Sequence, residues 1–512
     1  MLTFLYLVCV SVISVNDAAR ILAVFPTPSI SHQVVFRPLT QELARRGHEI
    51  TIVTTDPAFP KNGTPPNLTE INVHDLSYKL WIENILNANK NDLKGQLEAF
   101  FPTMIDIVVQ QLQVNEVQQL INDKTKKFDL LILEACARPA LVYSHIYKVP
   151  VILVSSFGAM PGNLGAVGAP EHPILYPNPL KQKHNNLTMW DKITEIYNYY
   201  LFNYMLKNFE NFEVEVFRKY VGPDTPTVSE LNKNVHMLFL NIHPVFEGIR
   251  PVPPTVVFMG GLHQNPVKEL PTDLKSYLDA SEHGVIYMSF GTNMNTSHLS
   301  ADKIKKFVKV FSKLPYNVLW KWDGDELPGR TDNIRISKWL PQSDLLRHPK
   351  IKLFITQGGL QSTDEAITGG VPLIGVPMLG DQWYNVERYV YHKIGVKIDM
   401  ATLNEEEFKN AITTVIGDES YRRNVARLRT LMYDQPQRPL ERAVWWTEYV
   451  LRHGGAKHMR APTANITWTE FLELDLVLTL LITLLILVSS FISLVYYVCI
   501  NYVTSKKKTK EA

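Results

Sequence analysis

The chain has 512 residues, of which 46% are hydrophobic and 20% are charged, and its formal net charge is only +2. This length and composition predict a globular protein that is too long for one ordinary core, with two domains of roughly 200 residues each. The near-neutral charge, with no dense basic patch before the last few residues, argues against nucleic acid as a partner.

The first predicted segment is a secretory signal peptide. An apolar run at residues 2–15 is followed by the small residues Ala18 and Ala19, a pattern that resembles a signal even though the charged n-region is missing. A buried first strand is the alternative, but a better first strand follows immediately at residues 21–25. We therefore assign residues 1–18 to a signal that is removed near Ala18.

An α/β pattern begins directly after this segment. Strand-like apolar runs occupy residues 21–25, 49–54, 129–133 and 151–154. Helical patterns occupy residues 32–46, 81–119 and 189–218. Strands that alternate with helices in this way are typical of a parallel sheet covered by helices.

A second α/β series follows a segment rich in proline and glycine at residues 251–271, which we interpret as the connection between two domains. Its strand-like runs occupy residues 285–289, 318–321, 334–337, 353–356 and 373–376. The predicted architecture is α/β, with two Rossmann-like, doubly wound domains that face a cleft.

The C-terminal end predicts a membrane anchor. Residues 476–503 carry no charge and are long enough to cross a bilayer of about 30 Å as a helix. Acidic residues precede this run and lysines follow it, so the positive-inside rule predicts a type I protein with a lumenal body. Lys508 and Lys510 resemble a retrieval signal of the endoplasmic reticulum, although a simple stop-transfer cluster is the alternative.

These features divide the chain into seven segments. They are a signal (1–18), an acceptor-binding N-terminal domain (19–260), a linker (261–275), a C-terminal domain (276–437), C-terminal helices (438–473), a transmembrane helix (474–503) and a cytosolic tail (504–512). Only Cys136 remains in the lumenal body, because Cys9 lies in the signal and Cys499 in the span, so no disulfide is expected. Candidate glycan sites are Asn62, Asn67, Asn186, Asn295 and Asn465.

The most specific motif is a strand that runs into the glycine turn Gly358-Gly359 and then into a helix. Glycines at such a junction let a ligand approach the backbone, and the N–H groups of the helix N-terminus suit a diphosphate. Glu365, one turn into the helix, can accept from a ribose hydroxyl. After the next strand, Asp381 and Gln382 can hold vicinal hydroxyls of a sugar. A glycine turn alone is weak support, but the whole spaced set is specific.

This motif resembles the signature of the UDP-glycosyltransferase family, and the likeness extends over essentially the whole chain. Gln357 in place of the common histidine is similar to the insect branch. The resemblance implies a GT-B fold, with the acceptor in the N-terminal half and the UDP-sugar in the C-terminal half. It implies that Trp339 stacks on uracil. The donor-binding residues that it implies are Ser289, Gly291, Thr292, Trp339, Gln342, Gln357, Gly358, Gly359, Gln361, Ser362, Glu365, Asp381 and Gln382.

The predicted general base is His32. It follows the first strand at the carboxyl edge of the sheet, where α/β proteins bind ligands, and it begins a helix whose positive end favours a neutral imidazole. The family pairs this histidine with an aspartate, and the matching position here holds Glu134, which can orient the ring in the same way. Asp323 and Asp325 form an Asp-x-Asp sequence that metal-dependent transferases use, but an ordinary acidic turn is the preferred interpretation. We expect no metal and no cofactor besides the co-substrate UDP-sugar.

The resemblance therefore implies an inverting hexosyltransferase that moves a sugar from a UDP-sugar to a hydroxyl of small lipophilic acceptors, as in detoxification. The likeness to the insect branch favours glucose as that sugar over glucuronate, which vertebrate relatives often transfer. Gln357 cannot become cationic, so the leaving group would depend on backbone N–H groups. Because Glu134 and Gln357 depart from the common pattern, the second hypothesis is a non-catalytic lumenal carrier of lipophilic molecules. A glycosidase is a poorer third, and homo-oligomerisation stays open.

Overall fold

The computed structural model describes residues 18–60, 63–86, 93–177, 179–181, 183–184, 186–292 and 299–511. The predicted signal, up to Asp17, and the sequons at Asn62 and Asn295 lie outside these residues. The chain forms two compact units, Met1–Arg460 and Ala461–Ala512. The first unit holds both predicted α/β series.

The N-terminal series forms a seven-stranded parallel sheet with the order β3-β2-β1-β4-β5-β6-β7. Its strands are β1 (Arg20–Phe25), β2 (Glu49–Thr54), β3 (Leu68–Asn72), β4 (Leu130–Glu134), β5 (Val151–Ser155), β6 (Val235–Leu240) and β7 (Val256–Phe258). The chain runs from β1 outward in one direction through β2 and β3, and then in the other direction from β4. The strand order therefore reverses between β1 and β4, which is where open α/β sheets bind ligands.

Helices cover both faces of this sheet. The α-helices are α2 (Ile30–Arg45), α3 (His74–Trp81), α4 (Leu93–Leu112), α5 (Asn115–Asn122), α6 (Val142–Tyr147), α7 (Asn163–Ala166), α8 (Met189–Tyr220), α9 (Val228–Leu231) and α10 (Pro244–Glu247). Leu22 and Val24 of β1 pack in one apolar core with α4 and α5, while Ile21 and Ala23 pack in another with α2. Two buried faces explain why β1 is apolar at every position after Arg20.

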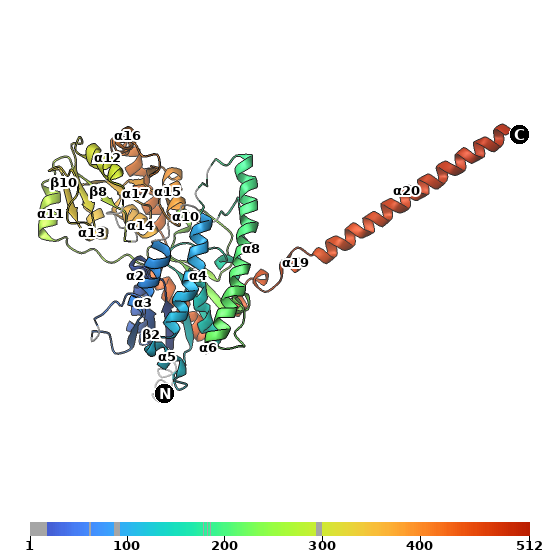
Figure 1. Ribbon diagram of the computed structural model, residues 1–512, viewed down its shortest axis with the longest axis horizontal. Coiled ribbons are helices and arrows are strands. Elements are labelled where there is room, and N and C mark those ends of the chain that lie inside the picture. The colour runs from blue at the N-terminus through green and yellow to red at the C-terminus, as the bar shows by residue number, and fades with distance from the viewer. Residues whose placement is uncertain are drawn as a thin grey trace, which may run out of the picture. The chain divides into compact units, whose positions relative to one another are not determined.

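The C-terminal series forms a six-stranded parallel sheet with the order β10-β9-β8-β11-β12-β13. Its strands are β8 (Val285–Ser289), β9 (Asn317–Lys321), β10 (Ile334–Ser337), β11 (Ile351–Thr356), β12 (Leu373–Gly375) and β13 (Gly395–Lys397). Its helices are α11 (Thr272–Asp279), α12 (Ala301–Phe311), α13 (Gln342–Leu346), α14 (Leu360–Gly369), α15 (Gln382–Tyr391), α16 (Glu405–Gly417) and α17 (Glu419–Tyr433). Figure 1 shows this yellow-to-orange half beside the blue-to-green N-terminal half. The predicted pair of α/β domains is confirmed.

Two features of this unit were not visible in the sequence pattern. Strand β7 lies inside the proline-rich segment and completes the first sheet, because its Val256 and Val257 are buried against β6. Helix α18 (Pro439–Arg452) follows the second domain in the chain, yet it packs in the core of the first one. Ala443 and Val444 are fully buried there with the side chains of α2 and β1.

The second unit contains α19 (Trp468–Phe471) and α20 (Leu474–Glu511). Within α20, the stretch Leu474–Lys506 is long and apolar enough to cross a membrane, judged by length and composition alone. The apolar side chains of this stretch are exposed, so they do not form part of a core within this unit.

Candidate active site

A histidine–carboxylate pair lies at the reversal point of the first sheet. His32 lies in the first turn of α2, directly after β1, and Glu134 is the last residue of the neighbouring strand β4. His32 Nδ1 lies 2.7 Å from Glu134 Oε1. The Glu134 side chain is completely buried, whereas the His32 side chain is 15% exposed and lines a cleft. When Nδ1 donates to Glu134, Nε2 is the nitrogen that accepts a proton from a substrate.

Glu134 is held by more than His32. Its Oε2 accepts the backbone N–H of Thr27 at 3.0 Å, and its Oε1 accepts the Cys136 thiol at 3.0 Å. Burial alone would raise the pKa of Glu134, but the hydrogen bonds and charge of His32, together with Cys136 and the Thr27 N–H, outweigh burial and lower that pKa. Glu134 is therefore a buried carboxylate, suited to orient an imidazole and to stabilise its cationic form.

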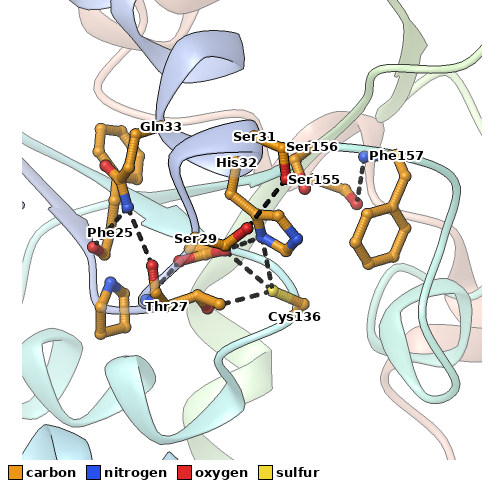
Figure 2. A network of polar contacts seen from close by, with 12 residues as sticks. Phe25, Thr27, Ser29, Ser31, His32, Gln33, Cys136, Ser155, Ser156 and Phe157 are labelled. Atoms are coloured by element: carbon orange, nitrogen blue, oxygen red, sulfur yellow. Dashed lines mark hydrogen bonds and ion pairs between the residues drawn. The ribbon is translucent and has the colours of Figure 1, made fainter. Parts of the chain in front are cut away.

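Phe157 fixes the other side of the His32 ring. It follows β5, and its ring lies edge-on to the imidazole with 5.4 Å between centroids and an interplanar angle of 75°. Figure 2 shows His32 with Cys136 and Thr27 on one side and Phe157 on the other. No sequence motif pointed to Phe157 or Cys136 as neighbours of His32, because these contacts depend on how β1, β4 and β5 align.

The predicted donor residues line the same cleft as His32. This cleft has a volume of about 360 Å³ and is lined from both α/β halves. From the C-terminal half it is lined by Ser289, Gly291, Thr292, Trp339, Gln342, Gln357, Gly359, Gln361, Ser362, Glu365, Asp381 and Gln382. Gly358 is the one predicted donor residue that does not line it. Residues from strand ends scattered over the sequence thus meet at one site.

One end of the cleft offers an aromatic surface and a hydrogen-bonded carboxyl group. Trp339 is 68% exposed, which is unusual for a tryptophan and leaves its indole open to a planar base. Gln342 Nε2 donates to Glu365 Oε2 at 2.7 Å and to Ser362 Oγ at 2.9 Å, and its Oε1 accepts from the Tyr287 hydroxyl at 2.9 Å. Burial raises the pKa of Glu365 to about 7. Tyr287 is a member of this network that the sequence did not identify.

Two tightly packed glycines lie at the centre of the cleft, Gly291 in its wall and Gly358 directly before the wall residue Gly359. Gly291 and Gly358 have φ of +75° and +92°, where a side chain is strained. A Cβ on Gly291 would also collide with the Gln357 amide, and one on Gly358 would lie 2.6 Å from Val386 Cγ2. Helix α14 begins directly after Gly359, so its unpaired N–H groups face this point. The arrangement suits an anion such as a diphosphate.

The end nearest the base carries Asp381 and Gln382. Asn385 Nδ2 donates to Asp381 Oδ2 at 2.8 Å, and Gln382 Oε1 accepts the N–H groups of Met378 and Leu379, each at 2.8 Å. Burial raises the pKa of Asp381, and the charge of His32 opposes that rise. Asp381 and His32 therefore face the same cleft, from opposite α/β halves.

Gln361 makes a contact that the sequence did not predict. Its Nε2 donates to the Ser156 carbonyl at 2.9 Å, and Asn241 Nδ2 donates to the same oxygen at 3.0 Å. The Gln361 side chain therefore joins α14 to the loop that carries Phe157, and it connects the two α/β halves beside the base.

The Asp-x-Asp sequence forms ion pairs with lysines. Lys321 Nζ lies 3.0 Å from Asp323 Oδ1, and Lys338 Nζ lies 2.6 Å from Asp325 Oδ1. Each carboxylate thus has a cationic partner of its own, which is the arrangement of an ordinary acidic turn.

Two further cavities lie in the N-terminal half, with volumes of about 200 and 550 Å³. The smaller one reaches Cys136, directly behind the His32–Glu134 pair. The larger one is lined along one side by α8. They share wall residues, namely Leu97, Met160, Pro161, Gly162, Phe202 and Asn203. Their mixed apolar and polar walls are typical of small-molecule sites.

Comparison with known proteins agrees with this geometry. A family model described as UDP-glucoronosyl and UDP-glucosyl transferase matches residues 20–509. The chain is 34% identical over 494 residues to an ecdysteroid UDP-glucosyltransferase of Spodoptera littoralis nuclear polyhedrosis virus, which covers 92% of this chain and 95% of that protein. It is 31% identical over 511 residues to UDP-glycosyltransferase UGT5 of Dactylopius coccus, and this alignment covers 97% of this chain and 94% of that protein.

Among solved structures, a UDP-glucose: anthocyanidin 3-O-glucosyltransferase in complex with UDP superimposes with a TM-score of 0.58 at 15% identity. The superposition covers 85% of this chain and 99% of that one. At this level of identity the likeness establishes the fold, and the predicted GT-B architecture is confirmed.

Proposed function

Because the chain belongs to the family of UDP-glucuronosyl and UDP-glucosyl transferases and is therefore an enzyme that uses a UDP-sugar, we propose that it transfers glucose, with inversion, to a hydroxyl of a lipophilic acceptor. The observation that carries this proposal is the His32–Glu134 pair, 2.7 Å apart, in which His32 lines one cleft together with residues of the motif from Gln357 to Gln382.

The proposed reaction is a single displacement at the anomeric carbon. His32 Nε2 takes the proton of the acceptor hydroxyl as its oxygen attacks, and Glu134 stabilises the imidazolium that forms. The new C–O bond forms on the face opposite UDP, and the bond between the anomeric carbon and the diphosphate oxygen breaks. Asp381 and Gln382 hold the sugar hydroxyls. Attack from the opposite face inverts the anomeric centre.

The departing diphosphate gains negative charge, and uncharged hydrogen-bond donors of the chain stabilise it. Gln357 presents its amide beside Gly291 and Gly359, where its Nε2 can donate one hydrogen bond. The N–H groups at the start of α14 supply the rest, with the positive end of the helix dipole. The proposed chemistry needs no metal and no cofactor besides the UDP-sugar.

The proposed acceptor is a polycyclic or aromatic alcohol of steroid size that enters the two cavities of the N-terminal half. The larger cavity, of about 550 Å³, lies in the size range of small-molecule pockets, and the smaller one, of about 200 Å³, reaches the back of the His32–Glu134 pair at Cys136. Relatives in nuclear polyhedrosis viruses are described as ecdysteroid UDP-glucosyltransferases, which supports an acceptor of this size.

We also propose that α20 anchors the enzyme in the membrane of the endoplasmic reticulum, with the cleft on the lumenal side. The support is the length and apolar composition of Leu474–Lys506 and the lysines that follow it in the sequence.

The transfer reaction is tested by UDP release from UDP-glucose and from UDP-glucuronate, side by side, with a panel of phenols, alcohols and steroids. The variant His32→Ala should lower kcat by 10²-fold or more, since a positioned general base contributes about 10²–10⁴-fold. Binding of UDP should be unchanged, because its residues lie in the other α/β half. UDP binding without release for any acceptor would instead support the carrier hypothesis, and full turnover by His32→Ala would contradict the mechanism.

A further inference from the structure

The proposed mechanism leaves Cys136 without a role, although it lies against both members of the catalytic pair. Its Sγ is 3.0 Å from Glu134 Oε1 and 3.7 Å from His32 Nδ1. Figure 2 shows the thiol directed at His32 and Thr27. We propose that His32, Glu134 and Cys136 form a binding site for a thiophilic divalent cation such as Zn²⁺, and that the bound cation switches the enzyme off.

The donor set is the one that Zn²⁺ prefers, namely an imidazole nitrogen, a thiolate sulfur and a carboxylate oxygen. The three ligand atoms all lie within 4.8 Å of one another. In a tetrahedral zinc site the nitrogen and sulfur are about 3.5 Å apart, and the observed separation of Nδ1 and Sγ is 3.7 Å.

Only the carboxylate must adjust. Glu134 Oε1 lies 2.7 Å from Nδ1 and 3.0 Å from Sγ, whereas a shared metal would hold such atoms about 3.3–3.5 Å apart. A retreat of Oε1 by roughly half an ångström therefore makes room for the ion. The other carboxylate oxygen, Oε2, accepts the Thr27 N–H at 3.0 Å and keeps this hydrogen bond when the ion binds. A hydrogen bond of this kind orients a carboxylate that binds a metal.

A route to the site exists along the acceptor side. Cys136 lines the cavity of about 200 Å³, which shares wall residues with the larger cavity beside α8. An ion that enters along this cavity meets the Cys136 sulfur first.

Binding would inactivate the base through its tautomer. The ion displaces one proton, that of the Cys136 thiol, which leaves to solvent. The imidazole stays neutral, and its single proton moves through solvent from Nδ1, which now binds the metal, to Nε2. A protonated Nε2 cannot accept the proton of the acceptor hydroxyl. This effect on turnover rests on the proposed role of His32, whereas the coordination itself does not. The donor residues of the C-terminal half are not ligands, so UDP binding should persist.

Coordination is tested on the full chain in detergent with Co²⁺, under a non-chelating reductant. Ligation by Cys136 predicts a sulfur-to-cobalt charge-transfer band in the near ultraviolet, which Zn²⁺ should abolish by competition. The band should disappear in Cys136→Ser, which keeps a hydroxyl donor for Glu134, and weaken in His32→Ala. Cys499→Ser is the matched control, because it removes the other cysteine of the described residues and should leave the band intact.

Inhibition is measured separately, as the fraction of each variant's own metal-free rate. Zn²⁺ should inhibit the parent and Cys499→Ser by more than tenfold at a concentration that leaves Cys136→Ser less than twofold affected, and UDP binding should not change. A parent protein with no charge-transfer band, or a band retained by Cys136→Ser, would overturn the site. A band without inhibition would leave the site standing and would contradict the proposed role of His32.

Discussion

At the scale of single residues, the proposed catalytic pair carries a glutamate where the family resemblance implies an aspartate. Glu134 is one methylene longer than the aspartate that the family resemblance implies, yet its Oε1 reaches His32 Nδ1 at 2.7 Å. The longer side chain also meets the Thr27 N–H and the Cys136 thiol. Three donors on one buried carboxylate explain how it keeps its charge despite desolvation.

The variants Glu134→Gln and Glu134→Asp separate charge from length. Glu134→Gln removes the charge that stabilises the imidazolium and permits the wrong tautomer, so kcat should fall by about 10³-fold. Glu134→Asp keeps the charge and should lose far less, on the order of tenfold. Steady-state kinetics check both, with UDP binding as the control for folding. Equal losses for the two variants would mean that the contact length, and not the charge, matters.

Asp364 predicts a pH dependence of stability. It is buried in α14 beside Glu365, and burial followed by the charge of Glu365 raises its pKa to about 8. The unfolded chain loses this proton near pH 4, whereas the folded chain retains it until about pH 8. Between these values the unfolded state binds fewer protons, so this group lowers stability progressively as the pH rises.

Asp364→Asn removes that cost while keeping the shape of the side chain. The variant should melt several degrees higher than the parent at pH 8 and less so at pH 5, since about 1 kcal/mol corresponds to 2–4 °C in a domain of this size. Differential scanning calorimetry at the two pH values measures the shift. A shift that is equal at both pH values would contradict the titration of Asp364.

At the scale of elements, helix α8 has two different faces. Phe202 lines both cavities of the N-terminal half, whereas Trp190, three turns earlier, is 74% exposed. If the acceptor lies in these cavities, the first position must contact it and the second must not.

Phe202→Ala should therefore raise KM for a steroid-sized acceptor about tenfold, in line with the 1–3 kcal/mol that a buried aromatic side chain contributes. KM for UDP-glucose should not change. Trp190→Ala is the matched control on the same helix and should leave both KM values as they are. A change in KM for UDP-glucose with Phe202→Ala would indicate a general disturbance of the fold.

Elements with a strong local pattern were predictable from the sequence. Residues 49–54, 285–289 and 334–337 form strands with the predicted bounds, because each is a short apolar run bounded by polar or turn residues. Strand β3 was not predicted, since three of its five residues, Thr69, Glu70 and Asn72, are polar and it lies at the edge of its sheet. Pairing with β2 defines it as a strand.

At the scale of the whole molecule, the first compact unit is complete before helix α20 begins. Helix α18 returns from the second domain and buries Ala443 and Val444 in the core of the first one. Arg46 and Glu448 add an ion pair of 3.2 Å between α2 and α18. The compact unit therefore ends at Arg460 and includes α18.

Two truncations test this organisation together with the proposed anchor. A chain that ends at Arg460 should remain folded, retain transfer activity and be released from membranes by alkaline carbonate, because only the unit with α20 is missing. A chain that ends at Gln437 should lose most of its activity and its cooperative unfolding, because the core of the first domain loses α18. Retention of the first truncated chain in the membrane after carbonate would contradict an anchor formed by α20 alone.

The sequence by itself determined the features that a contiguous stretch of chain encodes. The strand, glycine turn and helix start at 354–365 predict a diphosphate site because backbone conformation and helix polarity are local properties. The apolar run before the C-terminal lysines likewise predicts a helix of membrane-spanning length, because length and hydropathy are properties of one contiguous segment.

Only the tertiary structure decided the contacts between stretches that are distant in the chain. The alignment of β1 with β4 brings Cys136 and Glu134 to His32, and closure of the two halves brings Gln361 to Ser156. These contacts depend on sheet order and on the side chain that fills each gap. Neither property is written in the composition or period of any single segment.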